Sequence, residues 1–296
     1  MLRRTLSAIT LAATLALASP AIAQTQGPAM PTPTTSGNAP VNGVEVYYAV
    51  YGEGDPIVLL HGGFGAIEMF GPVIDLLAAG HQVIGVDLLA HGRTAPHERP
   101  ISFEAMADDI AELITYLGHD KADVLGYSTG GGVAMRLGIQ HPDKVDKLIL
   151  VSVPYTNAGW HQANLDGMAQ LGAGSAEFMK ATPMYQMFAA INPDPETNWV
   201  KLHIQQGQLI NAPYDYSAEL AAMTVPTMLV VGDWDAVRIA HAAAFFELLG
   251  GGRADAGWDG AGMNANRFAV LPGQTHYTIF ASPQLAAAAL SFIDAP

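Results

Sequence analysis

A serine between two glycines is the residue of this chain best suited to covalent chemistry. Ser128 lies between Gly126 and Gly130, directly after the apolar residues 122–125 and before a helical pattern over 129–140. A sharp strand-to-helix turn of this kind exposes the hydroxyl as a nucleophile, and larger side chains at the glycine positions would clash. The helix N-terminus that follows favours a developing negative charge. The pattern predicts acyl transfer with Ser128 as nucleophile.

A serine nucleophile needs a general base, and His276 is the histidine best placed to act as one. It lies in a Pro-Gly-containing loop after the apolar residues 268–271. We predict that His276 takes the proton of Ser128. The other histidines after the serine fit ordinary surface or core positions at a helix end, in a cap or on a helix: His141, His161, His203 and His241.

An acid that orients the base is expected between the serine and the histidine, at a strand end. The apolar residues 225–231 lead into Gly-Asp-Trp-Asp, which offers Asp233 and Asp235. Asp235 is deeper in the loop and is the predicted partner of His276, which it would hold in one tautomer. Asp233 is the alternative, or fixes the turn.

Two backbone N–H groups are needed to stabilise the oxyanion. One is predicted from Thr129, the residue after the nucleophile. The other is predicted from His-Gly-Gly-Phe-Gly at residues 61–65, with Gly63 as first choice and Phe64 as second. We expect His61 to hold this loop by hydrogen bonds rather than to move protons.

These residues must be positioned by alternating strands and helices. Short apolar strands are predicted at 44–50, 57–60, 82–87, 122–125, 147–151, 225–231 and 268–271. Helices are predicted at 103–117 (with Ser102 as N-cap), 129–140, 237–249 and 283–293. The alternation predicts an α/β fold with a mostly parallel, doubly wound sheet, whose strand ends gather the loops at one edge.

The remaining segments suggest how the chain is divided. Residues 1–23 resemble a secretory signal peptide cut after Ala23, which predicts a secreted or periplasmic protein. Residues 24–40 are expected to be a flexible leader, and 41–154 with 223–296 the core. Residues 155–222, rich in methionine and aromatic side chains, are predicted to form an inserted helical cap. The Gly-rich residues 250–266 suggest no role.

Composition excludes several classes of function. The 296 residues carry 13 Lys and Arg against 27 Asp and Glu, a net charge of −14, which disfavours binding to nucleic acid or anionic membranes. After residue 23 no apolar stretch is long enough for stable membrane insertion. The absence of cysteine excludes disulfides and thiolate metal sites, and no His-Glu-x-x-His motif occurs. We expect no metal, no cofactor, and a monomer or homodimer.

The ordered motifs resemble the landmark segments of the α/β-hydrolase family, from about residue 41 to the C-terminus. They are residues 61–65, 87–94, 126–131, 232–235 and Pro272-Gly273-x-x-His276. In the segment 87–94, Ala90 and Thr94 stand where the family usually has glycine and serine, and the resemblance implies a structural role for His91. The Ser-Thr-Gly-Gly turn is similar to the esterase and haloperoxidase-like branch with a serine nucleophile.

The resemblance implies hydrolysis without fixing the reaction. Family dehalogenases and epoxide hydrolases use an aspartate nucleophile, so Ser128 argues against both. Phe64 departs from the His-Gly-Gly-Pro-Gly of proline iminopeptidases. We expect cleavage of a carboxylic ester of a small, fairly hydrophobic substrate through an acyl-enzyme. The alternatives are a lactonase, a carbon–carbon bond hydrolase, a cofactor-free perhydrolase or haloperoxidase, and a receptor-like ligand-binding protein with negligible turnover.

Overall fold

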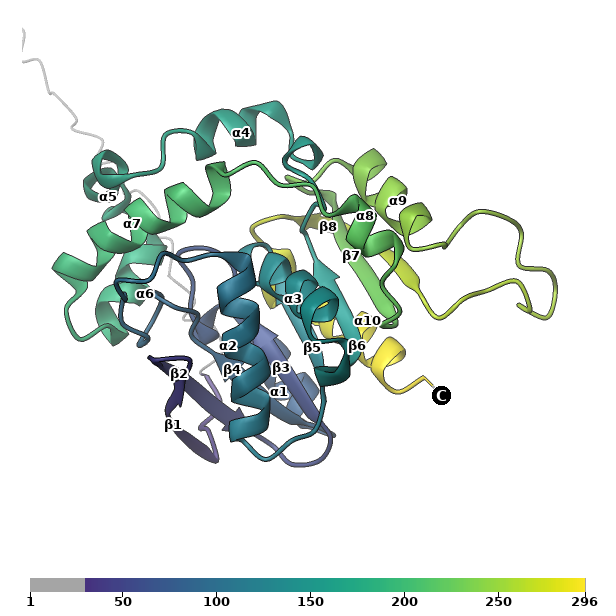
Figure 1. The fold of residues 1–296 in the computed structure, drawn as a ribbon, viewed down its shortest axis with the longest axis horizontal. Helices are drawn as coiled ribbons and strands as arrows, with labels where there is room; N and C mark the ends of the chain where they lie inside the picture. Colours follow the sequence, from purple (N-terminus) through teal and green to yellow (C-terminus); the bar gives the residue numbers. More distant parts are fainter. Residues whose placement is uncertain (1–29, 296) are drawn as a thin grey trace, which may run out of the picture.

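A computed structural model describes residues 30–295, in which eight strands form one sheet (Figure 1). Its spatial order is β1-β2-β4-β3-β5-β6-β7-β8. The first two pairings, β1 with β2 and β2 with β4, are antiparallel, and the other five are parallel. The strands are β1 (Thr35–Val41), β2 (Val44–Tyr51), β3 (Pro56–Leu60), β4 (Gln82–Val86), β5 (Ala122–Tyr127), β6 (Val145–Val151), β7 (Thr227–Trp234) and β8 (Arg267–Thr275).

Helices cover both faces of this sheet. The side chains of Val58 and Leu60 join the apolar cluster of α2, α3 and α9, whereas those of Ile57 and Leu59 join the cluster of α1 and α10. This alternation buries both faces of β3, as expected for parallel strands. The predicted doubly wound α/β fold is therefore confirmed. The helices are α1 (Pro72–Ala78), α2 (Phe103–Tyr116), α3 (Thr129–Gln140), α9 (Ile239–Leu248) and α10 (Pro283–Ile293).

Two details near the start of the chain bear on the sequence predictions. The predicted N-cap of α2 is confirmed, because Ser102 accepts a hydrogen bond from the Ala105 N–H at 3.1 Å. The flexible leader, however, is wrong for residues 35–40, which belong to β1. The turn Asn42-Gly43, with φ of 47° and 82°, joins β1 to β2 as a two-residue hairpin. The predicted signal peptide lies outside the described residues.

Between β6 and β7 the chain makes a large helical excursion. Figure 1 shows α4 to α7 gathered together beyond one end of the sheet, on the side away from the C-terminus. A bridge between Thr156 and Asp215 joins the two ends of the excursion, and Trp199 is buried within it. Its helices are α4 (Gln162–Met168), α5 (Ala173–Met179), α6 (Pro183–Ile191), α7 (Pro195–Asn211) and α8 (Ser217–Ala221).

The residues between α9 and β8 form the other large departure from the strand–helix alternation. Residues 250–266 form a projecting segment without regular secondary structure (Figure 1), and its residue Trp258 is fully exposed. Within residues 30–295, every helix is too short or too polar to cross a bilayer.

Candidate active site

Ser128 occupies a strained turn between β5 and α3. Its φ of 52° lies in the left-handed region that non-glycine residues rarely adopt. The neighbouring glycines permit the turn, since a Cβ at Gly126 would lie 2.3 Å from the carbonyl oxygen of Gly130. A Cβ at Gly130 would in turn lie 2.2 Å from the carbonyl oxygen of Leu60. The strain is the kind found where a fold fixes a reactive side chain.

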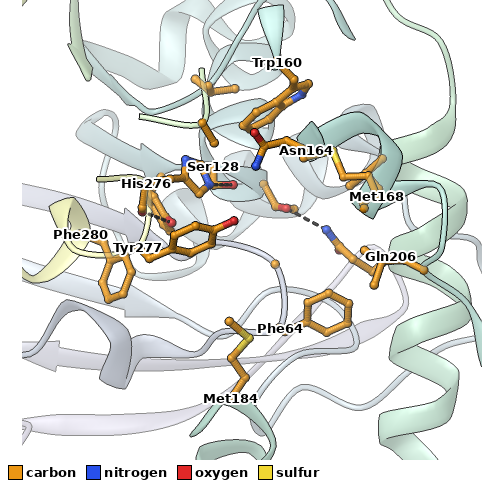
Figure 2. A pocket seen from close by; sticks show the side chains of 18 of the residues that line it. Phe64, Ser128, Trp160, Asn164, Met168, Met184, Gln206, His276, Tyr277 and Phe280 are labelled. Carbon is orange, nitrogen blue, oxygen red and sulfur yellow. Dashed lines mark hydrogen bonds between the residues drawn. The ribbon is translucent and has the colours of Figure 1, made fainter. Parts of the chain in front are cut away.

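The structure brings Ser128 together with both of its predicted partners. His276 directly follows β8, and its Nε2 lies 3.1 Å from Ser128 Oγ (Figure 2). Its Nδ1 lies 3.0 Å from Asp235 Oδ1, just beyond β7. Because a carboxylate only accepts, Nδ1 carries the proton, Nε2 is the acceptor and the serine hydroxyl donates. Residues that follow the order Ser-Asp-His along the chain thus form one hydrogen-bonded line in the spatial order Ser128, His276, Asp235.

Asp235, rather than Asp233, is the carboxylate that meets the histidine. Asp233 is exposed to solvent, whereas Asp235 is buried. Asp235 Oδ2 accepts from the Ser152 hydroxyl and from the Gly232 N–H at 3.0 Å. Burial opposes its charge, but the bond from His276, together with those from Ser152 and Gly232, holds the pKa of Asp235 below its usual value. The acid is therefore ionised and ready to orient the imidazole.

The imidazole of His276 is also fixed from its other sides. The buried Tyr127 hydroxyl donates to the His276 carbonyl oxygen at 2.6 Å, and the Tyr127 ring centroid lies 5.2 Å from that of the imidazole. The Trp160 ring packs edge-on at 5.4 Å. Burial raises the pKa of Tyr127 well above its usual value, so this hydroxyl remains a donor.

The three predicted oxyanion donors all border the same cavity as Ser128. Gly63, Phe64 and Thr129 line it, and no hydrogen bond to another described residue occupies their N–H groups. Thr129 is the first residue of α3, so its N–H lacks a partner within the helix. By contrast, the N–H of Gly65 donates to Gly62 and that of Gly130 donates to His61. The free N–H groups do not distinguish Gly63 from Phe64.

His61 and His91 lie behind this loop as buried structural groups. His61 Nε2 accepts from the Leu88 N–H at 3.0 Å, so its Nδ1 carries the proton and donates to the Gly62 carbonyl. The His91 ring packs 5.1 Å from that of His61. Burial lowers the pKa of His61 to about 4, and burial together with the neighbouring His61 lowers the pKa of His91 to about 3. Both are neutral near pH 7.

Ser128 opens into a cavity of about 620 Å³ between the sheet edge and the helical excursion (Figure 2). Its walls are mainly apolar, and neither Lys, Arg, Asp nor Glu lines it. The helices α4, α5 and α6 contribute methionines, and Phe280 also lines the cavity. The five lining methionines are Met69, Met168, Met179, Met184 and Met187. An uncharged, largely apolar ligand fits such walls.

Sequence reasoning missed several polar residues around the reacting groups. Ser152 directly follows β6, and a polar residue ending a buried strand was the signal that could have found it. Gln206 donates to Thr129 Oγ1 at 2.8 Å, and Asn164 faces the same cavity. Both are embedded in helical patterns, so nothing in the sequence distinguished them. Among residues 30–295, no three His, Asp or Glu side chains gather in a way that could hold a metal ion.

Known proteins with similar sequences include a putative carbamate hydrolase and an esterase. RutD of Azorhizobium caulinodans is 29% identical over 215 residues, 65% of this chain and 78% of that protein. Esterase YbfF of Escherichia coli is 35% identical over 98 residues, only 33% of this chain and 38% of the esterase.

Solved structures share the same architecture. A meta-cleavage product hydrolase of Pseudomonas fluorescens, CumD, superposes with a TM-score of 0.67 at 18% identity, over 88% of this chain and 98% of that one. At this identity the likeness shows the fold alone. The sequence pattern of the alpha/beta hydrolase fold matches residues 55–235, more than half of the chain. The chain therefore belongs to the α/β-hydrolase family.

Proposed function

We propose that this protein hydrolyses a carboxylic ester of an uncharged, largely apolar small molecule through an acyl-enzyme. Ser128 Oγ attacks the ester carbonyl carbon while His276 Nε2 takes the hydroxyl proton. The resulting oxyanion is stabilised by the N–H of Thr129 and by that of Gly63, with Phe64 as the alternative donor. His276 then protonates the leaving alcohol, and a water molecule repeats the sequence to release the acid.

One observation carries this proposal: the unbroken hydrogen-bonded line from Ser128 through His276 to Asp235, with separations of 3.1 Å and 3.0 Å. In this line the carboxylate fixes the tautomer that leaves Nε2 free to accept the serine proton. The line ends in the cavity, beside unoccupied backbone N–H groups. Nucleophile, base and anion-stabilising donors thus meet at one point.

The cavity walls support an uncharged substrate. A substrate carboxylate or ammonium group would lose water there without gaining a side chain of opposite charge, because neither Lys, Arg, Asp nor Glu lines the cavity. Methionine side chains adapt to irregular apolar shapes, which supports a range of acyl or alcohol chains rather than one rigid group. Lactones, carbon–carbon substrates and peracid formation remain the alternatives for the same acyl chemistry.

The test is hydrolysis of short- and medium-chain p-nitrophenyl esters by the wild type and by Ser128→Ala. We expect turnover by the wild type and loss of several orders of magnitude in kcat in the variant, as for other serine nucleophiles. A matched control is Ser175→Ala, a serine of α5 outside the cavity lining.

The possible results separate the alternatives. Equal activity of the wild type and Ser128→Ala would show that Ser128 is not the nucleophile. A stoichiometric burst without turnover would favour a ligand-binding role, and activity confined to lactones or carbon–carbon substrates would replace the ester assignment.

A further inference from the structure

Two side-chain amides of the helical excursion border the reacting end of the cavity. Asn164 on α4 and Gln206 on α7 line it together with Ser128 and Thr129. Figure 2 shows the Asn164 amide pointing from its helix toward Ser128. The Gln206 amide donates a hydrogen bond to Thr129 Oγ1. Most of the other lining residues from the excursion are aliphatic, aromatic or methionine. Two primary amides beside the nucleophile therefore need an explanation.

Gln206 is held firmly, yet its hydrogen-bonding capacity is only half used. One end of its amide is 2.8 Å from Thr129 Oγ1, whereas the other end has no partner among the described residues, although the residue is only 2% exposed. A Cβ at Gly63 would lie 2.6 Å from this amide, so the glycine leaves room for it. Gln206 thus fixes the Thr129 side chain beside the proposed oxyanion donors.

Asn164 is the freer of the two amides. It is half-buried, and no hydrogen bond joins its side chain to another described residue. A bound substrate displaces water from the cavity, and a polar group that then finds no hydrogen-bond partner weakens binding. Unless the substrate supplies a hydrogen-bonding atom at this point, Asn164 opposes binding.

The chemistry of an amide specifies the group that it pairs with. A primary amide is neutral and offers both donors and an acceptor, so its best complement is a neutral group that also does both. A hydroxyl meets this requirement. A carboxylate does not, because it cannot donate to the amide oxygen and the lining offers no Lys or Arg to balance its charge.

We infer that the preferred ester carries a hydroxyl close to its scissile carbonyl, bound by Asn164, with its apolar remainder among the methionines. Asn164 then selects the substrate through this hydrogen bond. The inference rests on the proposed ester hydrolysis and narrows its substrate class.

The experiment compares ethyl 3-hydroxybutyrate with ethyl butyrate, two uncharged esters that differ by one hydroxyl, by acid release in a pH-stat. The readout is the ratio of their kcat/KM values. We expect a ratio of about ten for the wild type, the value of one hydrogen bond, and a ratio near one for Asn164→Leu. The control Gln205→Leu changes a neighbouring amide on α7 that lies outside the cavity lining, and should keep the wild-type ratio.

Each outcome is decisive. A wild-type ratio near one, or an undiminished ratio in Asn164→Leu, overturns the inference while leaving ester hydrolysis intact. A ratio that falls equally in Gln205→Leu also overturns it, because the effect would then be structural. Absence of turnover on both esters, and on p-nitrophenyl esters, removes the proposed function and this inference with it.

Discussion

Replacing Asp235 with asparagine is the most informative test of its proposed role, which is to hold His276 in the tautomer that accepts the Ser128 proton. Each carboxylate oxygen accepts two bonds: Oδ1 from the His276 Nδ1–H and the Val237 N–H, and Oδ2 from the Ser152 hydroxyl and the Gly232 N–H. An asparagine can place its oxygen on only one side, and its NH₂ then faces a backbone N–H on the other. Whichever way it turns, a buried N–H loses its acceptor, at a cost of about 1–3 kcal/mol in stability.

Activity should fall far more than stability. If the NH₂ group turns toward His276, the imidazole must change tautomer and can no longer accept the Ser128 proton; a comparable change in a serine protease lowers kcat about 10⁴-fold. The assay is p-nitrophenyl butyrate hydrolysis, with urea denaturation in parallel. Asp233→Asn, two residues earlier and exposed, is the matched control and should stay within twofold of the wild type. Asp235→Asn with more than a tenth of wild-type activity, or an equally inactive Asp233→Asn, would refute the reasoning.

Two further perturbations follow from the contacts of the site. Tyr127→Phe removes the 2.6 Å bond to the His276 carbonyl, so kcat should fall about tenfold with little change in KM; an unchanged kcat would show that the ring packing alone holds the base. His91 has a pKa of about 3 in the folded chain against the usual 6.5, so the unfolded chain protonates first as pH falls, and stability present above about pH 6.5 is lost toward pH 3. Urea denaturation at a series of pH values should therefore show that, between pH 7 and 5, the wild type loses about 2 kcal/mol more free energy of unfolding than His91→Gln. The same loss in both proteins would contradict this.

How much could be predicted from the sequence depended on whether a signal was local. The Ser128 turn follows from glycines that a strand-to-helix turn requires, and the structure shows why: a Cβ at either glycine would overlap backbone. The strands of the parallel sheet are short apolar runs, which their burial on both faces demands. Such local requirements can be recognised in a single chain.

Other features depended on contacts between distant segments. β1 contains Gly, Asn and Pro and buries only Ala39 and Val41, so its own sequence does not resemble a strand. The signal that could have revealed it is Asn42-Gly43, a hairpin turn that pairs the segment before it with β2. Gln206 meets Thr129 across 77 residues of sequence, and helical periodicity cannot reveal such a contact.

The central claim is that Ser128 is the nucleophile, and covalent labelling tests it most directly. An alkyl fluorophosphonate traps an activated serine, and the labelled protein is digested with trypsin and mapped by mass spectrometry. Cleavage after Lys121 and Arg136 isolates Ser128, whereas Ser152 falls on a different peptide after Lys147. The account predicts one phosphonyl adduct per chain, on the Ser128 peptide, and none in Ser128→Ala. Labelling elsewhere, or equal labelling of the variant, would contradict it.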